Sequence, residues 1–578
     1  MASIIYKSRD IRPLVPDDES IWQFLLRCNP ELVKADKVIF QEHERRQNTL
    51  TFGESRVKAA QGAAGLAKVL GLRPGDTIGI CGANSVNWVL AAYAASWAGI
   101  TFAAINPLAS PHEFVHYLNN ASVSVLLADG AIFPKVKEAQ SLDRNLANVR
   151  LVALDSASQE IPLVRCPTGF ARPEPPILMP MNNLQWPRDF LSSGSSPVFD
   201  LSNRGNKDVV ATICFSSGTS GKPKGVELSH RNLIASLLAS RAGIPETFNS
   251  QQVEVFYAPF CHIYGLLTAV FSAAFIGHFV LTIQAFKLHD YLKACEEKRA
   301  TVMRVVPPTA MAMTKDPFVA TLDLKSVQTL SCAGAVLGDE TQNILQGILG
   351  SVSVIQGYGM TEGGMTSVKP ILAREKAGSV GSLLPNVELR IVDDDLKDVP
   401  TGASGEILTR GPTTFLGYRK NPEATAEAYP FGDGWMRTGD VGYMDKDGFL
   451  WLTDRKKELI KYKGNQVAPA ELEDIILQYP GVLECAVCAT WDDKQETEVP
   501  VAYVNLKPTV AATEREATLR EIRAFVDQRV ASYKKLRGGV EYLAQIPRNP
   551  TGKILRRLLP AQIALEAKAA AAKRKGKL

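Results

Sequence analysis

A short loop at residues 216–225 places the strongest constraint on how this chain folds. The loop contains three glycines, four hydroxyl side chains and two lysines, and it follows an apolar, strand-like run at residues 209–215. A helix-like run at residues 232–238 comes after it. Because glycine carries no side chain, backbone N–H groups in such a loop are able to close on phosphate oxygens. The loop lacks the Gly-Lys-Ser/Thr ending of a Walker A motif, so we interpret it as a phosphate loop of another kind, with an ordinary surface turn as the alternative.

Helix-like and strand-like runs alternate on both sides of this loop. Residues 52–70 and 86–98 have the pattern of helices, and residues 77–81 and 100–105 have the pattern of strands. The alternation resumes after the loop and continues to about residue 349. This β–α–β order predicts a parallel sheet with helices on both faces, which is an α/β fold.

The chain changes character from residue 387 onward. Short alternating apolar runs separated by turn-forming residues predict a small β-rich subdomain at about 387–456. From about residue 458 helix-like and strand-like runs alternate again, which predicts a separate α+β unit. With 578 residues the chain exceeds one ordinary domain. We expect a large N-terminal domain at 1–456, which includes the β-rich subdomain, and a smaller C-terminal domain at 457–578.

The composition excludes several classes of protein. A hydrophobic content of 46% supports large cores and excludes wholesale disorder. The net charge of +5 is small for this length and gives no reason to expect a nucleic-acid partner. The nine cysteines are scattered, which favours a reducing compartment. Residues 255–286 contain no charged side chain, but Pro259, Gly277 and His278 interrupt them, so we expect a buried helix and a buried strand rather than a transmembrane segment.

Two short patterns have the spacing of metal sites. Residues 112–116 read His-Glu-x-x-His, the pattern of zinc proteases, although no third ligand motif accompanies them. Pro111 and Glu113 also suit the first turn of an ordinary helix, and we favour that structural role. Cys485 and Cys488 have metal-ligand spacing, but they lie in an apolar run that predicts a buried strand.

Six further segments combine turn-forming and polar residues in ways that suit a nucleotide site. Glycines on both sides of Tyr358 allow a tight turn that presents the face of the ring, and Glu362 follows closely as a ligand for Mg²⁺. Asp440 lies in a turn where a carboxylate can accept both hydroxyls of a ribose, although an Asp in a turn is also a common cap. The segments are residues 259–265, 331–338, 356–362, 435–442, 454–466 and 547–557.

In this order, the phosphate loop and these segments resemble the motifs of the adenylate-forming superfamily of AMP-binding enzymes. The resemblance extends from about Thr51 to Arg557 and is greatest to 4-coumarate–CoA ligases and medium-size acyl-CoA synthetases. It implies an acid–thiol ligase that uses ATP, Mg²⁺ and coenzyme A with a small-molecule carboxylic acid. The acid is first converted to an acyl-adenylate with release of pyrophosphate, and the acyl group then passes to coenzyme A.

The resemblance also implies site residues. Tyr358 is expected to stack on adenine, Thr361 to contact the α-phosphate, and Lys553 to bridge the carboxylate and that phosphate. The catalytic residues implied are Lys553, Lys461, His262, Thr361 and Glu362, with Glu362 as the metal ligand. The ATP or AMP site implied is Ser216, Ser217, Gly218, Thr219, Ser220, Gly221, Lys222, Lys224, Gly334, Ala335, Gln356, Gly357, Tyr358, Gly359, Thr361, Asp440, Arg455, Lys457, Lys461, Gln466 and Lys553.

The same resemblance places the other two substrates and a hinge. Coenzyme A is expected beside Lys463 and Gly464, and the C-terminal domain is expected to rotate about Lys457 between the two steps, so that Lys553 leaves and Lys461 arrives. The acid pocket implied comprises His262, Ile263, Tyr264, Arg304, Ala333, Gly334 and Gly357. Arg304 departs from the family, because it lies in a stretch that is usually uncharged. It either faces the acid tunnel and pairs with a distal polar or acidic group of the substrate, or it points outward.

Two alternatives to a CoA ligase share these motifs. One is a luciferase-type oxygenase, and the other is a stand-alone adenylation enzyme that uses a different acceptor.

The cellular location of the protein is a second open question. The chain ends in Gly576, Lys577 and Leu578, which approaches the peroxisomal Ser-Lys-Leu address, so both a peroxisomal location through an import receptor and a cytosolic location are expected outcomes.

Overall fold

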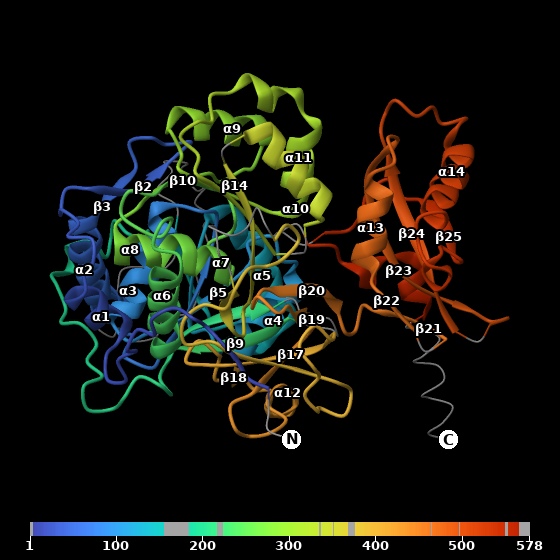
Figure 1. The fold of residues 1–578 in the computed structure, drawn as a ribbon. Helices are drawn as coiled ribbons and strands as arrows, with labels where there is room; N and C mark the ends of the chain where they lie inside the picture. Colours follow the sequence, from blue (N-terminus) through green and yellow to red (C-terminus); the bar gives the residue numbers. More distant parts are fainter. Residues whose placement is uncertain are drawn as a thin grey trace.

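The computed structural model describes residues 4–154, 184–216, 223–334, 337–350, 352–367, 376–463, 465–495, 497–548 and 553–565. Figure 1 shows a large body, coloured blue to yellow and orange, with a smaller orange-red domain beside it. The C-terminal tripeptide Gly576 to Leu578 lies outside the described residues.

A seven-stranded sheet carries the first β–α–β units. Its strand order is β18-β9-β8-β5-β4-β6-β7, and the strands from β8 to β7 are parallel. Its strands are β4 (Thr77–Cys81), β5 (Thr101–Ala104), β6 (Val125–Ala128), β7 (Arg150–Ala153), β8 (Val210–Ser216), β9 (Lys224–Ser229) and β18 (Gly417–Tyr418). The helices before and between these strands are α2 (Phe52–Leu70), α3 (Val86–Trp97), α4 (Pro111–Ala121) and α5 (Phe133–Leu142). The predicted helix at 52–70 is thus confirmed to the residue.

An eight-stranded sheet forms the second layer. Its order is β15-β14-β13-β12-β10-β11-β2-β3, with parallel pairing from β14 to β2. Its strands are β2 (Val38–Glu42), β3 (Thr49–Thr51), β10 (Val253–Phe256), β11 (Phe279–Thr282), β12 (Val302–Val305), β13 (Thr329–Ala333), β14 (Ser353–Met360) and β15 (Gly364–Ser367). Helices α1 (Ile21–Arg27), α6 (His230–Gly243), α9 (Leu288–Glu297), α10 (Pro307–Lys315) and α11 (Asp339–Leu349) accompany it. These two mainly parallel sheets confirm the predicted α/β fold.

The expected β-rich subdomain and the smaller C-terminal domain follow. The former is a five-stranded sheet of β1 (Tyr6–Lys7), β16 (Glu388–Val392), β17 (Gly405–Arg410), β19 (Met436–Met444) and β20 (Leu450–Arg455), with α12 (Pro422–Ala428) between β18 and β19. The latter contains the hairpin β21 (Ile460–Tyr462) and β22 (Asn465–Val467), α13 (Pro469–Leu477), β23 (Val482–Asp492), β24 (Thr497–Leu506), α14 (Arg515–Asp527) and β25 (Gly539–Tyr542).

The segment after the phosphate loop differs from the strand–loop–helix prediction. A strand, β9, lies between the loop and α6 and pairs antiparallel with β8, so that Ser216 is level with Lys224. Val226 and Leu228 are buried on one side of the strand, whereas Glu227 on the opposite side is partly exposed. The loop therefore connects two antiparallel strands rather than a strand and a helix.

Both patterns with metal-like spacing have structural roles. Pro111 is the first residue of α4, and Ser110 and Glu113 form a capping box at its start, as expected for an ordinary helix. Cys485 and Cys488 are buried on β23. Among the described residues, no group of three or more histidine, cysteine or acidic side chains is arranged to hold a metal ion.

The uncharged stretch at 255–286 is a broken helix followed by a strand. Helix α7 (Ile263–Gly265), a π-helical turn (Leu266–Phe271) and α8 (Ser272–Ile276) run together and end at Gly277, whose φ of 66° is left-handed. Strand β11 follows inside the eight-stranded sheet. None of the described helices combines the length and the apolar character needed to cross a membrane.

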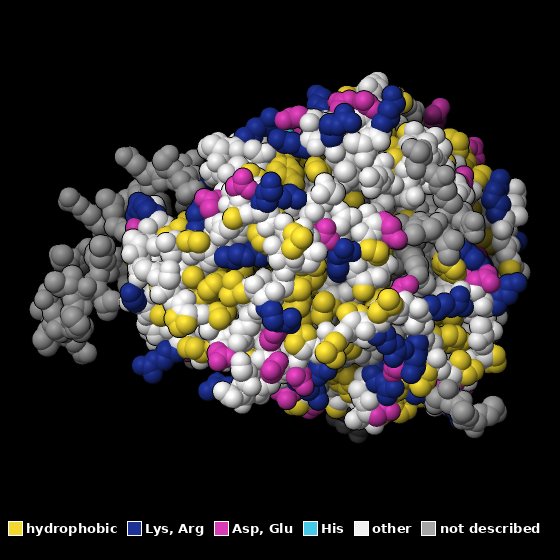
Figure 2. Space-filling model, turned by 60° about the vertical axis from the view of Figure 1, so that its left-hand side comes forward, with side chains coloured by type: hydrophobic (Ala, Val, Ile, Leu, Met, Phe, Trp, Pro, Cys, Tyr) yellow, Lys and Arg dark blue, Asp and Glu magenta, His cyan; other side chains and the backbone are white. Residues whose placement is uncertain are grey.

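Charged side chains of both signs are scattered over the face of the molecule shown in Figure 2. On the face shown in Figure 2, lysine and arginine are interspersed with aspartate and glutamate and with small apolar groups. This mixture agrees with the small net charge of +5.

Candidate active site

A cavity of about 1310 Å³ lies where the two large sheets, the β-rich subdomain and the C-terminal domain meet. It is lined by the ends of β8 and β14, by α6 and the π-helical turn after α7, by β12 and β13, and by β19 and β20. Lys553 of the C-terminal domain also lines it. A site built from so many separated segments depends on the whole fold being in place.

The phosphate-loop end of the cavity is formed by β8 and β9. Ser216 and Lys224 both line the cavity, and residues 217–222, which include the predicted Ser217, Gly218, Thr219, Ser220, Gly221 and Lys222, lie outside the described residues. The Ser216 hydroxyl is buried and has no hydrogen-bond partner within the described residues. The Lys224 ammonium lies 4.5 Å from the centre of the Tyr418 ring. A buried hydroxyl and a lysine at this edge suit the oxygens of a phosphate chain.

Three side chains meet at the β14 and β19 side of the cavity: Tyr358 and Asp440, which are buried, and Arg455, which is partly exposed. The Tyr358 hydroxyl donates to Asp440 Oδ2 at 2.7 Å, and Arg455 Nε lies 3.2 Å from Asp440 Oδ1. Burial and the Asp440 carboxylate raise the pKa of the Tyr358 hydroxyl well above its usual value. These two contacts hold the Asp440 carboxylate in one orientation, which is what recognition of a ribose by both of its hydroxyls requires.

Glu362 and Thr361 are buried in the turn that follows β14, and both line the cavity. Tyr418, from the short strand β18, donates its hydroxyl to Glu362 Oε1 at 3.0 Å. Tyr418 thus contacts both the candidate metal ligand and the candidate phosphate-binding lysine, but the sequence analysis missed it. It lies more than fifty residues from Glu362 along the chain, in a short Gly-Tyr strand that carries no recognisable motif.

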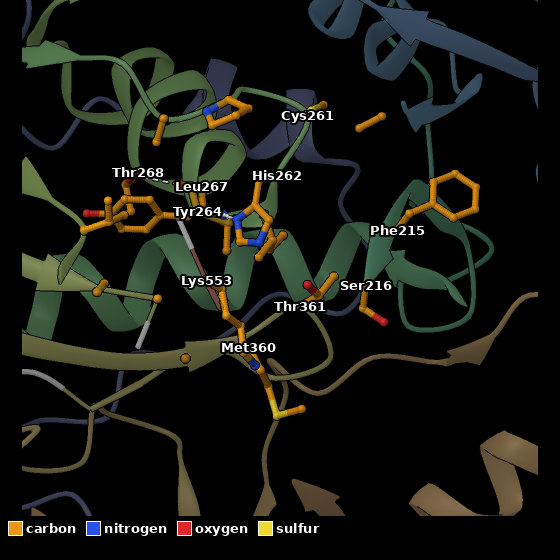
Figure 3. A pocket seen from close by; sticks show the side chains of 18 of the residues that line it. Phe215, Ser216, Cys261, His262, Tyr264, Leu267, Thr268, Met360, Thr361 and Lys553 are labelled. Carbon is orange, nitrogen blue, oxygen red and sulfur yellow. Dashed lines mark hydrogen bonds between the residues drawn. The ribbon is translucent and has the colours of Figure 1, made fainter. Parts of the chain in front are cut away.

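Lys553 supplies an ammonium group from a different domain. Figure 3 shows it reaching into the space between His262 and Met360. Burial, and the nearby Arg455 charge, lower the pKa of Lys553 to about 8. At neutral pH the side chain remains mainly protonated in the cavity, so its charge acts on any anion placed there.

His262 has a defined tautomer. It precedes α7, and its Nδ1 accepts the backbone N–H of Tyr264 at 3.2 Å. Burial lowers the pKa of His262 to about 4, so the ring is neutral at pH 7. The proton is therefore on Nε2, which leaves an N–H donor for a carboxylate in the cavity.

The acid side of the cavity combines small and apolar residues. The predicted Ile263, Tyr264, Ala333, Gly334 and Gly357 all line it. Gly334 has a φ of 97°, so a side chain here would be strained. A Cβ atom at Gly359, which also lines the cavity, would lie 2.5 Å from the Gly364 carbonyl oxygen. The close pairing of β14 and β15 therefore requires glycine at this position.

Arg304 does not point outward. It is 7% exposed, lines the cavity, and donates from Nε to Glu254 Oε2 at 2.7 Å. Glu254 is 0% exposed, and burial raises the pKa of its carboxyl, although Arg304 acts in the opposite direction. The expected partner of Arg304 was a group of the substrate; nothing in the sequence points to this partner on the neighbouring strand, because a contact between strands leaves no local signal there.

Some of the predicted site residues do not line the cavity, although Lys457 does. Gln356 is buried below the cavity wall, where its side-chain amide bonds both the N–H and the carbonyl of Leu337 at 2.8 Å. Lys461, Lys463 and Gln466 are exposed on the β21–β22 hairpin, which Figure 1 shows at the lower end of the C-terminal domain. Ala335 and Gly464 lie outside the described residues.

Comparison with known proteins agrees with this architecture. Residues 31–419 match the family model of AMP-binding enzymes, and residues 471–553 match the model of the C-terminal domain of AMP-binding enzymes. The chain is 34% identical over 524 residues to 4-coumarate–CoA ligase 2 of Oryza sativa subsp. japonica, covering 89% of this chain and 88% of the relative. It is 34% identical over 522 residues to 4-coumarate–CoA ligase 2 of Nicotiana tabacum, covering 89% of each chain.

A solved structure of a CoA synthetase has a similar fold over nearly the whole chain. The o-succinylbenzoate–CoA synthetase of Bacillus subtilis, in complex with ATP and a magnesium ion, superposes with a TM-score of 0.73 at 25% identity, covering 94% of this chain and 99% of the other. The family models, the full-length relatives and the residues gathered around the cavity lead to one conclusion. The chain is an enzyme of the adenylate-forming superfamily and belongs to the family of AMP-binding enzymes.

Proposed function

We propose that this protein is an AMP-forming acyl- or aryl-CoA ligase. The observation that supports the proposal most strongly is the presence of Lys553 in the cavity together with Arg455, Thr361 and His262. Lys553 comes from a separate domain and lies among groups that suit a carboxylate and a phosphate. Its positive charge can offset the repulsion between these two anions while they react.

In the first step a carboxylate oxygen of the acid attacks the α-phosphorus of ATP, and pyrophosphate leaves. The His262 Nε2–H orients the carboxylate, and the Lys553 ammonium offsets the repulsion between the two anions. Asp440 binds the ribose, while Ser216 and Lys224 contact the leaving phosphates. The transition state is thus stabilised by fixed charges and donors, and no covalent intermediate with the enzyme is required.

The residues present also fit a magnesium ion. Glu362 presents a carboxylate to the cavity close to Lys224 and Tyr418, and hard cations such as Mg²⁺ bind carboxylate and phosphate oxygens. Glu362 would hold the ion, which supplies positive charge next to the phosphates. Removal of the ion by a chelator is expected to abolish the first step.

In the second step the thiol of coenzyme A attacks the acyl carbonyl and AMP leaves. Lys461 and Lys463 are exposed on a hairpin of the C-terminal domain, away from the cavity, so this step requires the domain to turn. Rotation about Lys457 would withdraw Lys553 and bring the hairpin toward the acyl-adenylate.

Pyrophosphate release measured over a panel of aryl and medium-chain acids, with and without coenzyme A, tests the proposal. We expect turnover with coenzyme A, and release without it that is limited to about one equivalent per enzyme because the acyl-adenylate stays bound. Multiple turnover without coenzyme A would instead indicate another acceptor. Absence of release with every acid would contradict the proposal.

A further inference from the structure

One wall of the acid cavity is the face of the eight-stranded sheet. Val302 and Arg304 on β12, and Thr329 and Ser331 on β13, all line the cavity. Alternate residues of a strand share a face, and the register places Arg304 level with Ser331. Ala333 lies two residues nearer the carboxyl end of the sheet, where His262 and the nucleotide side are found. Arg304 is therefore about 7 Å further into the cavity than Ala333.

The charge of Arg304 is already neutralised inside the protein. Glu254 lies on the neighbouring strand β10, is level with Val302, and accepts the Arg304 Nε–H at 2.7 Å. Gln252 donates to the same oxygen of Glu254 at 2.8 Å. Both charged side chains are buried, so the pair brings no net charge to this part of the cavity.

Although the pair is neutral, it still has hydrogen-bond donors and acceptors that are not used by the protein. Glu254 takes the Nε–H of Arg304 and the Tyr264 hydroxyl is close to the guanidinium, but a guanidinium has more N–H donors than these partners use, and Arg304 lines the cavity. The second oxygen of Glu254 is buried and has no hydrogen-bond partner in the described part of the chain. Donors left without acceptors in an enclosed place are costly, so the terminal amino groups of Arg304 favour a ligand that carries a hydrogen-bond acceptor.

We propose that the Glu254–Arg304 pair determines which acids this enzyme accepts. The pair binds an uncharged hydrogen-bonding group, such as a hydroxyl or ketone oxygen, at the far end of a monocarboxylic acid, and it disfavours a second carboxylate. A second carboxylate would introduce a charge that nothing in the neutral pair compensates. The inference rests on the proposed ligase function and adds the substrate class to it.

The test compares acids of equal chain length that end in a methyl, a hydroxyl or a carboxylate group, over several chain lengths. The value of kcat/KM is measured by pyrophosphate release. We expect the wild-type enzyme to favour the hydroxy acid over the dicarboxylic acid by about tenfold or more. Glu254→Gln keeps an acceptor for Arg304 but removes its counter-charge, so it should shift the preference toward the dicarboxylic acid by a similar factor.

The double variant Glu254→Gln/Arg304→Met serves as the matched control. It removes both charges together and leaves no buried ion unpaired, so it should fold, and an ATP-induced rise in melting temperature checks this. We expect it to lose the preference for the hydroxy acid over the methyl-terminated acid. Unchanged preferences in both variants would overturn the proposal while the ligase function stands. No pyrophosphate release from the wild type with any acid would overturn both.

Discussion

At the scale of single residues, the site depends on two side chains with different protonation states at neutral pH: a charged lysine and a neutral histidine. Lys553 is a cation with a pKa lowered by burial to about 8, and His262 is a neutral donor with a pKa lowered by burial to about 4. These values keep one positive charge and one neutral N–H in place near pH 7. The charge of Lys553 attracts a phosphate, and the N–H of His262 orients a carboxylate by a hydrogen bond.

The lowered pKa of Lys553 predicts an alkaline limit to adenylation. The lysine loses its charge as the pH rises through about 8, so kcat/KM for ATP, which reports the free enzyme, should fall above that pH. Lys553→Arg should be slower throughout because the shape of the cation differs, but it should lose this alkaline limb. A pH profile that is the same in both proteins up to pH 10 would contradict the assignment of the limb to Lys553.

Because His262 is neutral, its loss should weaken binding of the acid without changing how that binding depends on pH. His262→Ala should raise KM for the acid by about tenfold or more, because a hydrogen bond to a charged group contributes roughly 1.5–3 kcal/mol. Burial lowers the pKa of His262 to about 4, so no change in acid affinity should appear between pH 6 and 7.5 in either protein. A clear inflection near pH 6.5 in the wild type only would show that the ring ionises in the free enzyme.

At the scale of elements, local signals fixed some boundaries and missed others. Helix α2 begins after Thr51, which forms a capping box, and ends before Gly71 in the left-handed conformation, so both ends are readable from the sequence. Strand β9 was missed, because its identity depends on pairing with β8 across the phosphate loop. The Glu254–Arg304 and Glu362–Tyr418 contacts were missed for the same reason, since each joins strands or turns that are distant in the chain.

The β14–β15 hairpin gives a prediction at this scale. Gly359→Ala would place a Cβ atom 2.5 Å from the Gly364 carbonyl oxygen, so the hairpin that carries Thr361 and Glu362 must shift. We expect a loss of about 1–3 kcal/mol in unfolding free energy and a marked loss of adenylation. Gly347→Ala on α11, where nothing lies within 4 Å, is the matched control and should leave stability unchanged or raised. Equal stability in the two variants, measured by thermal unfolding, would contradict this account.

At the scale of the whole molecule, the C-terminal domain decides which chemistry the cavity supports. The structure has Lys553 in the cavity and Lys461 outside it, which is the arrangement suited to adenylation. The order of the motifs along the chain placed both lysines among the candidate catalytic residues. Which of the two lies in the cavity in this structure could not be predicted, because that depends on how one domain docks against the other.

Separate measurement of the two half-reactions tests the central claim most directly. Lys553→Ala should slow pyrophosphate release from ATP and acid by at least about a hundredfold, because a buried charge that acts in the transition state is lost. The same variant should form thioester from a supplied acyl-adenylate and coenzyme A at nearly the wild-type rate, and Lys461→Ala should show the reverse pattern. If both variants slowed both half-reactions equally, the claim that one cavity serves two chemistries through two lysines would be contradicted.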